Sequence, residues 1–276
     1  MLLCVGMLLV AVPVWAEQRN STIRIGLPNS LFSGQHVLVS EWGQYFQNKL
    51  HRPVKIVTLR MSKDAFVEQH MGRMDFAWIR DYPDTQIRSR IHLLAIPLYK
   101  GQPYFNSYLI VPATDTGTTS LLQLETAVFV FADPSANGSY LETRYELLMA
   151  GKNPAHFFRK IFFTHSEREV IEAVALQLAN AGSVDGSVWD SLAKARPDLT
   201  GQTRIIAKSH KYSAPPLVAS NSVSKEDYKA MQDALIGMAQ DPKGVELLKR
   251  LNLDGFIPGD VKMYEQVVKM KQALGE

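Results

Sequence analysis

The chain has 276 residues, of which 46% are hydrophobic and 21% charged, a composition that excludes a largely disordered protein. Its 30 basic and 27 acidic side chains leave a net charge of only +3, which does not point to nucleic acid as a partner. The one cysteine, Cys4, excludes a disulfide framework and a cysteine-based metal site. At about 150 residues per domain, the length predicts one or two domains.

Residues 1–16, MLLCVGMLLVAVPVWA, form an uncharged apolar run. Such a run before a small residue is typical of a secretory signal peptide, and it is shorter than the roughly 20 residues of a membrane span. The run lacks the usual preceding lysine or arginine, so an uncleaved interfacial anchor is the alternative. We expect cleavage after Ala16 and a periplasmic mature chain without cysteine.

The first part of the chain alternates strand-like and helix-like segments. Strands are predicted where apolar, β-branched and aromatic residues gather, at 22–26, 53–59, 74–79, 92–97 and 107–112. Residues 35–50 carry apolar side chains at helical spacing, and residues 62–72 predict a short helix that ends at Gly72. Strands that alternate with helices indicate βαβ units and a mainly parallel sheet.

A second alternation follows the turn-rich residues 112–117. It predicts strands at 126–131, 160–164, 184–188 and 203–207, and helices at 139–150 and 166–181. After the proline pair at 215–216, a short strand at 217–220 precedes helical stretches at 225–239, 243–251 and 261–274.

These segments predict an α/β protein of two lobes. Residues 17–113 and 215–276 form the first lobe, and residues 114–214 form a second lobe inserted into it. Two crossovers between the lobes imply a hinge, and a hinge between two α/β lobes implies a cleft. Ligands of open α/β sheets bind at the carboxyl ends of the strands, and here both sets of ends would face the cleft.

The sequence contains none of the motifs GxGxxG, GxxxxGK[ST], HExxH and GxSxG. No two of its seven histidines stand three or four residues apart, the spacing that would place a pair on one helix face. We therefore expect no enzymatic activity, no cofactor and no metal.

The segment 133–140, DPSANGSY, lies between a predicted strand and a predicted helix. Backbone N–H groups in the first turn of a helix lack partners within the helix, and together with the helix dipole they attract anions. Asn137 and Ser139 can add side-chain donors. The alternative is an ordinary helix cap after a tight turn.

Residues 127–192 resemble the second lobe of phosphonate- and phosphite-type (PhnD-like) periplasmic substrate-binding proteins. The resemblance extends from about residue 22 to about 258, through segments such as IRIGLPNS, GRMDFAWI, PYFNSYLIV and DPKGVELLKRLNLDGFIP. It implies a two-lobed type II periplasmic binding fold that closes over a small oxyanion.

The resemblance also implies ligand-binding positions in the 133–140 turn. In the family, hydroxyl side chains of a DPxSxSG turn hold the oxygens of the ligand. Here the hydroxyl positions read Ala136, Asn137 and Gly138, and Ser139 replaces the glycine that follows them. The ligand-binding candidates of this turn are Ser135, Asn137, Gly138, Ser139 and Tyr140.

Two charged candidates depart from the family pattern. Glu167 stands where the family has a ligand-facing histidine, and its carboxylate would repel a dianion unless it is protonated or paired with Arg168. Arg80 replaces a glycine, and a guanidinium binds an oxyanion through two parallel hydrogen bonds. The alternative for Arg80 is a surface ion pair with Asp81 or Asp84.

The remaining candidates are four aromatic residues and one acid. Tyr104 and Phe105 stand where the family places an aromatic ring against the ligand, with hinge packing as the alternative. Trp189, at a predicted strand end, either forms a wall of the cleft or fills the core. Asp190 matches a strand-end acid or amide of the family, or caps a helix at 191–195. Phe32 would cover the cleft.

The sequence thus predicts an exported, monomeric binding protein that delivers a small anionic ligand to an ABC permease. Contact with the membrane would be made only through that partner. The alternative is a periplasmic sensor of the same fold that presents its closed form to a histidine kinase or receptor.

Overall fold

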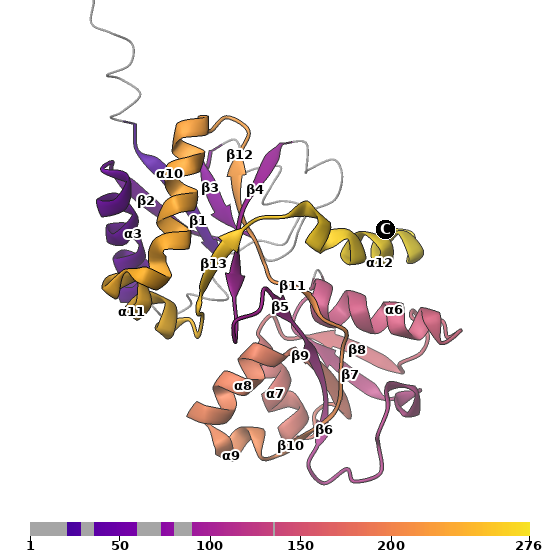
Figure 1. The fold of residues 1–276 in the computed structure, drawn as a ribbon. Helices are drawn as coiled ribbons and strands as arrows, with labels where there is room; N and C mark the ends of the chain where they lie inside the picture. Colours follow the sequence, from indigo (N-terminus) through magenta and orange to yellow (C-terminus); the bar gives the residue numbers. More distant parts are fainter. Residues whose placement is uncertain (1–20, 29–35, 60–72, 80–89, 135) are drawn as a thin grey trace, which may run out of the picture.

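The structure is a computed structural model that describes residues 21–28, 36–59, 73–79, 90–134 and 136–276. Its strands form a six-stranded sheet, β13-β4-β12-β3-β1-β2, a five-stranded sheet, β10-β6-β9-β7-β8, and a two-stranded ribbon, β11-β5. The two large sheets lie in separate lobes, and the ribbon lies between them (Figure 1).

The first lobe is a mixed sheet flanked by helices. Its strands are β1 (Ile23–Pro28), β2 (Val54–Leu59), β3 (Phe76–Trp78), β4 (Ile91–Leu98), β12 (Leu217–Ser220) and β13 (Gly255–Pro258). Its helices are α3 (His36–Leu50), α10 (Lys225–Ile236), η3 (Gly237–Gln240) and α11 (Pro242–Arg250). β1 is parallel to β2 and β3, whereas β12 and β13 run antiparallel to their neighbours, so the prediction of a mainly parallel sheet is wrong here. The predicted helix at 62–72 lies outside the described residues.

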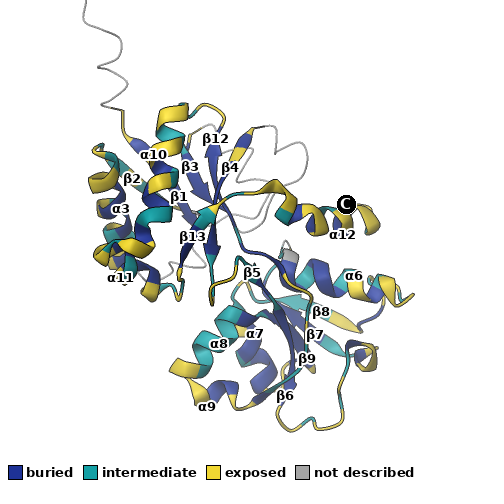
Figure 2. Cartoon of the chain, in the orientation of Figure 1, coloured by how far each residue is buried: buried dark blue, intermediate teal, exposed yellow. Residues whose placement is uncertain are grey.

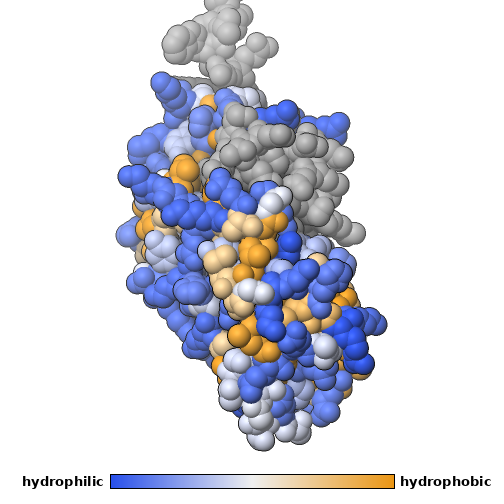
Figure 3. All heavy atoms as spheres, turned by 90° about the vertical axis from the view of Figure 1, so that its right-hand side faces the viewer, coloured by the Kyte–Doolittle hydropathy of each residue, from blue (hydrophilic) through white to orange (hydrophobic). Residues whose placement is uncertain are grey.

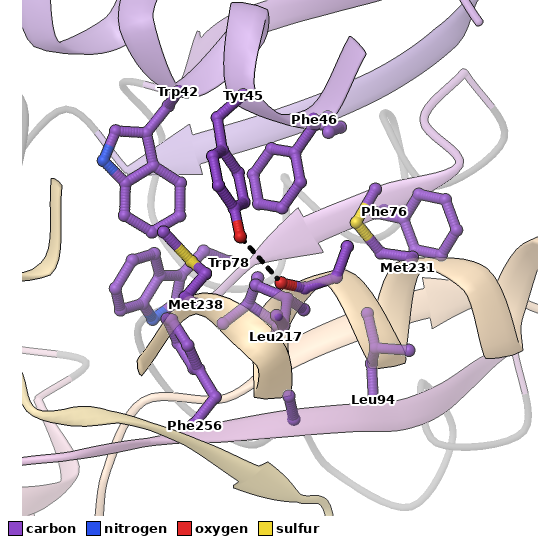
Figure 4. Close-up of a cluster of buried hydrophobic side chains, with 14 of the residues drawn as sticks. Trp42, Tyr45, Phe46, Phe76, Trp78, Leu94, Leu217, Met231, Met238 and Phe256 are labelled. Carbon is purple, nitrogen blue, oxygen red and sulfur yellow. Dashed lines mark hydrogen bonds between the residues drawn. The ribbon is translucent and has the colours of Figure 1, made fainter. Parts of the chain in front are cut away.

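Aromatic side chains form the centre of the first lobe's core (Figure 4). The ring centroids of Trp42 and Phe46 on α3 are 5.5 Å apart, and Trp42 also lies 5.9 Å from Trp78 of β3. The hydroxyl of Tyr45 donates to the carbonyl oxygen of Ala234 at 3.4 Å, which joins α3 to α10. The lobe therefore buries most of the apolar residues predicted within 35–50, whereas Val37, which was expected on the same face, is 67% exposed.

The second lobe is also a mixed sheet flanked by helices. Its strands are β6 (Ser107–Pro112), β7 (Val128–Phe131), β8 (Lys160–Phe163), β9 (Ala181–Asp185) and β10 (Thr203–Lys208). Its helices are η1 (Leu121–Leu124), η2 (Asn137–Leu141), α6 (Glu142–Met149), α7 (Glu167–Ala175), α8 (Gly186–Ala195) and α9 (Pro197–Thr200). The central strands are buried and the exposed residues lie on the helices and loops around them (Figure 2).

Two predicted elements of the second lobe are wrong in their bounds. The helix expected at 166–181 ends at Ala175, and Gln177 then adopts a left-handed φ of 58°. The strand expected at 184–188 runs from Ala181 to Asp185, because Asp185 caps α8 by accepting the N–H of Ser187 at 2.7 Å. Trp189 and Asp190 therefore lie inside α8 and not at a strand end.

The two crossovers of the chain pair with each other in the ribbon of β5 (Tyr104–Phe105) and β11 (Tyr212–Ser213). Tyr212 stands opposite Phe105, and Ser213 opposite Tyr104. Two crossovers were predicted, but the first lies at β5 and not at the turn-rich residues 112–117, because β6 already pairs with β9 and β10 in the sheet of the second lobe.

The C-terminal segment, η4 (Val261–Tyr264) and α12 (Glu265–Ala273), reaches from the first lobe to the second. Val267 and Met270 of α12 pack with Leu141, and Arg144 of α6 pairs with Glu276. Figure 3, which faces the side where α6 and α12 end, shows apolar side chains gathered in the middle of that face. Among the described helices, none is both long and apolar enough to span a membrane.

Candidate ligand-binding site

Three turns of the second lobe meet at one edge of its sheet. β7 is parallel to both β8 and β9, so the chain leaves all three strands on the same side, after Phe131, Phe163 and Asp185. Each strand is followed by a turn and then by a helix, namely η2 with α6, α7 and α8. This is the edge where an open α/β sheet binds its ligand.

The turn after β7 opens into an unusually wide helical turn. The N–H of Ala136 donates to the carbonyl of Asp133 at 3.2 Å, and the carbonyl of Ala136 accepts the N–H groups of Tyr140 and Leu141 at 3.2 and 3.1 Å. Residues Asn137–Leu141 form a π-helical turn that continues directly into α6. The first N–H groups of a helix have no acceptor within it, which is the reason the sequence predicts an anion site at this turn.

Ser139 is the candidate of this turn whose surroundings the structure describes most fully. Its side chain is 2% exposed, and its Oγ has no hydrogen-bond partner among the described residues. A buried hydroxyl without a partner costs about 1–3 kcal/mol, so proteins keep one mostly where it has a function. One carboxylate oxygen of Glu142, three residues further on, is likewise buried and unpaired, while its other oxygen lies 3.1 Å from Nδ1 of His210.

Of the other candidates in this turn, the structure describes the surroundings of Tyr140 and Gly138. Tyr140 packs in an aromatic cluster, with its ring 5.0 Å from Phe131 and 5.4 Å from Phe163, and the Arg144 guanidinium lies 5.1 Å from its centroid. Gly138 is buried. Ser135 and the side chain of Asn137 lie outside the described part of the chain.

Two carboxylates occupy the start of α8 at the same edge. Glu167 accepts the backbone N–H of Asp185 at 3.0 Å, and Asp185 in turn accepts the N–H and the hydroxyl of Ser187 at 2.7 and 2.6 Å. Burial raises the pKa of Asp185 above its ordinary value. Since the chain's own carboxylates bind these N–H groups, the start of α8 is less suited to an anionic ligand than the η2 turn.

Asp190 lies where the two lobes meet. Its Oδ2 accepts hydrogen bonds from the hydroxyl of Tyr99 at 3.1 Å, from Nζ of Lys100 at 2.5 Å and from the hydroxyl of Tyr108 at 3.3 Å. Burial and the neighbouring Asp190 charge raise the pKa of Tyr99 to about 12. Asp190 does not cap a helix at 191–195, because α8 begins at Gly186 and passes through it.

The aromatic candidates lie in packed surroundings. Trp189 donates from Nε1 to Thr203 Oγ1 at 3.2 Å, and its ring meets that of Tyr108 edge-on. Phe105 is 9% exposed and packs with the hinge residues around β11, as the alternative of hinge packing predicted, whereas Tyr104 is half-buried.

Phe32 and Arg80 lie outside the described residues, so their placement in a cleft stays a prediction. Within the part of the chain that the structure describes, no three His, Cys, Asp or Glu side chains are grouped so that they could hold a metal ion.

Tyr212 also lies in this region, although the sequence analysis did not select it as a candidate site residue. An added Cβ on Gly138 would lie 2.0 Å from Cζ and 2.2 Å from the hydroxyl oxygen of Tyr212. The ring therefore lies directly against the η2 turn. Nothing in the local sequence marks Tyr212, since its only neighbouring signal is the proline pair that follows the crossover.

Two lobes joined by paired crossovers, with a helix-opening turn at the sheet edge, define a periplasmic binding fold of type II, and solved structures agree. PhnD1 from Prochlorococcus marinus in complex with methylphosphonate is 18% identical, with a TM-score of 0.80 over 92% of this chain and 98% of that one. A binding protein component of an ABC phosphonate transporter from Pseudomonas aeruginosa is 19% identical, with a TM-score of 0.77 over 91% and 86%. A Xanthomonas citri protein bound to ATP is 19% identical, with a TM-score of 0.72 over 93% and 98%.

The chain belongs to the family of periplasmic substrate-binding proteins of phosphonate ABC transporters, whose family model matches residues 34–264. This family consists of substrate-binding transport proteins and not of enzymes, and its members act in the periplasm. Among curated protein sequences, none matches the chain significantly.

Proposed function

We propose that this chain is exported by its N-terminal apolar run, captures a small solute with a tetrahedral oxyanion group between its lobes and delivers it to an ABC importer. The observation that carries the proposal is the buried hydroxyl of Ser139 in the first turn of the η2–α6 helix, for which the described part of the chain offers no hydrogen-bond partner. Family membership and the likeness to the methylphosphonate complex of PhnD1 support the same ligand class.

In this mechanism, the second lobe supplies the anion-binding turn. The N–H groups at the start of η2 and the hydroxyl of Ser139 donate to the ligand's oxygens, and the positive end of the helix dipole stabilises their charge. The strand ends of the first lobe complete the site, with Arg80 as the proposed cation. Ligand binding selects the closed arrangement of the two lobes about β5 and β11.

The ligand-binding turn departs from the hydroxyl-rich turn of the family, and this sets an expectation for the ligand. Ala136 and Gly138 contribute no side-chain donors. We therefore expect backbone N–H groups to supply most of the binding, and the affinity to depend less on the organic part of the ligand than on its charged oxygens.

A thermal-shift screen tests the proposal. A ligand that binds only the folded state raises its stability by about 2.7 kcal/mol at a hundredfold excess over Kd. We expect methylphosphonate, phosphite or phosphate to raise the melting temperature, and carboxylates and uncharged sugars to leave it unchanged. No response to any tetrahedral oxyanion would contradict the proposal, and shifts that survive Arg80→Ala would remove Arg80 from the site.

A periplasmic sensor of the same fold is the second candidate function, favoured by the replacement of hydroxyl residues in the ligand turn. The two roles differ in the partner. Ligand-stimulated ATP hydrolysis by a reconstituted permease and ATPase from neighbouring genes supports transport, whereas ligand-dependent autophosphorylation of a neighbouring histidine kinase supports sensing.

A further inference from the structure

Tyr212 belongs to the hinge by its position and its packing. It lies on β11, in the second crossover, and pairs with Phe105 of the first. Its side chain is 8% exposed and belongs to a cluster that also contains Ile79, Ala214 and Val218. Ile79 follows β3 and Val218 lies on β12, so the cluster that contains Tyr212 extends into the sheet of the first lobe.

The far end of the same side chain contacts the second lobe at three places. The ring lies against the backbone of Gly138, where an added Cβ would lie within 2.0 Å of it. The hydroxyl lies 3.3 Å from Ser107 Oγ and donates to Asp185 Oδ2 at 3.5 Å. One side chain therefore joins the core of the first lobe, the hinge ribbon and the ligand turn of the second lobe.

We propose that Tyr212 is a positioning residue that couples the hinge to the η2 turn. The inference rests on the proposed function, because it assigns Tyr212 a role in the binding of the same ligand. Gly138 and Ser139 are adjacent, so a turn that follows the ring moves the Ser139 hydroxyl with it. Groups that bind a ligand must be held in place to within a fraction of an ångström, and the ring supplies that constraint from the hinge side.

The coupling works in both directions. Rotation about β5 and β11 displaces the ring, which is held in the first-lobe cluster, relative to Gly138. A ligand that fixes the η2 turn conversely fixes the ring and so restricts the hinge. The absence of a side chain at residue 138 is what allows this contact.

Four variants and a control test the coupling. Tyr212→Ala removes the ring, Tyr212→Phe keeps it, and Gly138→Ala pushes it away from the turn. The double variant Gly138→Ala/Tyr212→Ala provides a double-mutant cycle for the contact. Gly237→Ala is the matched control, since an added Cβ there meets no atom within 4 Å and its φ is −70°.

The first readout needs no ligand. Spin labels on cysteines that replace the exposed Lys229 of α10 and Lys194 of α8, in a Cys4→Ser chain, report the distance between the lobes. We expect Tyr212→Ala and Gly138→Ala to broaden the interlobe distance distribution of the folded protein at least twofold, and Tyr212→Phe and Gly237→Ala to retain the wild-type width.

The second readout is the affinity for methylphosphonate and for inorganic phosphate. We expect a loss of at least tenfold for Tyr212→Ala and for Gly138→Ala, and less than threefold for Tyr212→Phe. Hydrogen exchange of the peptide that covers residues 137–141 should accelerate at least tenfold in the same two variants.

Wild-type distance distributions in folded Tyr212→Ala and Gly138→Ala would overturn the coupling. If Tyr212→Ala does not fold, Gly138→Ala and Tyr212→Phe decide the same question. A wild-type protein that binds neither probe would instead refute the proposed function. The interlobe distances measured without ligand would still test whether Tyr212 restricts the hinge.

Discussion

Replacement of Ser139 by alanine should raise the stability of the free protein and weaken its binding of the ligand. These opposite effects follow from one feature, the buried Oγ that finds no hydrogen-bond partner in the part of the chain that the structure describes. In the free protein, the hydroxyl is buried and has no hydrogen-bond partner among the described residues, an arrangement that costs about 1–3 kcal/mol. Alanine removes this cost and is also the better helix former.

The expected gain is about 1 kcal/mol once the small hole left by the oxygen is taken into account, which corresponds to a rise of about 2–4 °C in Tm for a chain of this size. In the complex, Ser139→Ala removes a hydrogen bond to a charged oxygen, which contributes about 1.5–3 kcal/mol. The affinity for the anion should therefore fall about 10- to 100-fold. Thermal melts with and without methylphosphonate measure both effects in one experiment.

Ser220→Ala is the matched control, because Ser220 is also a buried serine but its Oγ lies 2.9 Å from that of Ser222, in the first lobe. This variant should lower the Tm by a few degrees and leave the ligand-induced shift unchanged. The reasoning is refuted if Ser139→Ala lowers the Tm of the free protein, or if it keeps the full affinity for an anion that the wild type binds.

Three further predictions follow from contacts in the second lobe and at the hinge. Gly182→Ala would bring a Cβ within 2.8 Å of Val130 Cγ1, so it should lower the free energy of unfolding by about 1–3 kcal/mol in a urea titration. Burial raises the pKa of Asp185, so the folded chain binds that proton more tightly than the unfolded chain, and stability is lost as the pH rises through the raised pKa. Asp185→Asn, which keeps a capping oxygen, should flatten that loss in thermal melts between pH 4 and 7, and an unchanged slope would contradict it. Asp190→Asn removes the negative charge next to Tyr99, so the pKa of that phenol should fall from about 12 towards 10 in an alkaline difference titration, and no change would disprove the contact in solution.

Local patterns predicted the order of the elements well because each lobe buries one face of each amphipathic segment. The apolar spacing within 35–50 correctly predicted the helix α3, and three of its predicted apolar residues, Leu38, Trp42 and Phe46, are buried. The β-branched and aromatic run at 126–131 similarly predicted the strand β7, which lies between β9 and β8 in its sheet. A turn before a helix is visible in the same way, whereas the first crossover was placed at 112–117 instead of at β5, because the sheet that β6 joins depends on its distant partners β9 and β10.

Contacts between segments far apart in the sequence could not be predicted. The bounds of β9 depend on Gly182, which fits between Val130 and Val170, and on the cap that Asp185 forms for α8. Neither is visible in the run AGSVDGSVWDSL, where Val184 and Val188 suggested a strand. Tyr212 was missed for the same reason, because its partner Gly138 lies 74 positions earlier in the chain.

The three helices that begin at the ligand edge of the second lobe show why one of them is the best anion site. At α7, the N–H of Glu169 donates to Ser166 Oγ at 3.4 Å, and at α8 the carboxylate of Asp185 takes the N–H of Ser187. Both of these ends carry a side-chain cap, and the second cap brings a carboxyl that opposes an incoming anion whenever it is ionised. In η2, the Ser139 hydroxyl has no partner among the described residues, so an oxyanion that binds there would gain this donor without displacing a described contact of that hydroxyl. The caps at α7 and α8 therefore favour the η2 turn over these two helix ends as the proposed anion site.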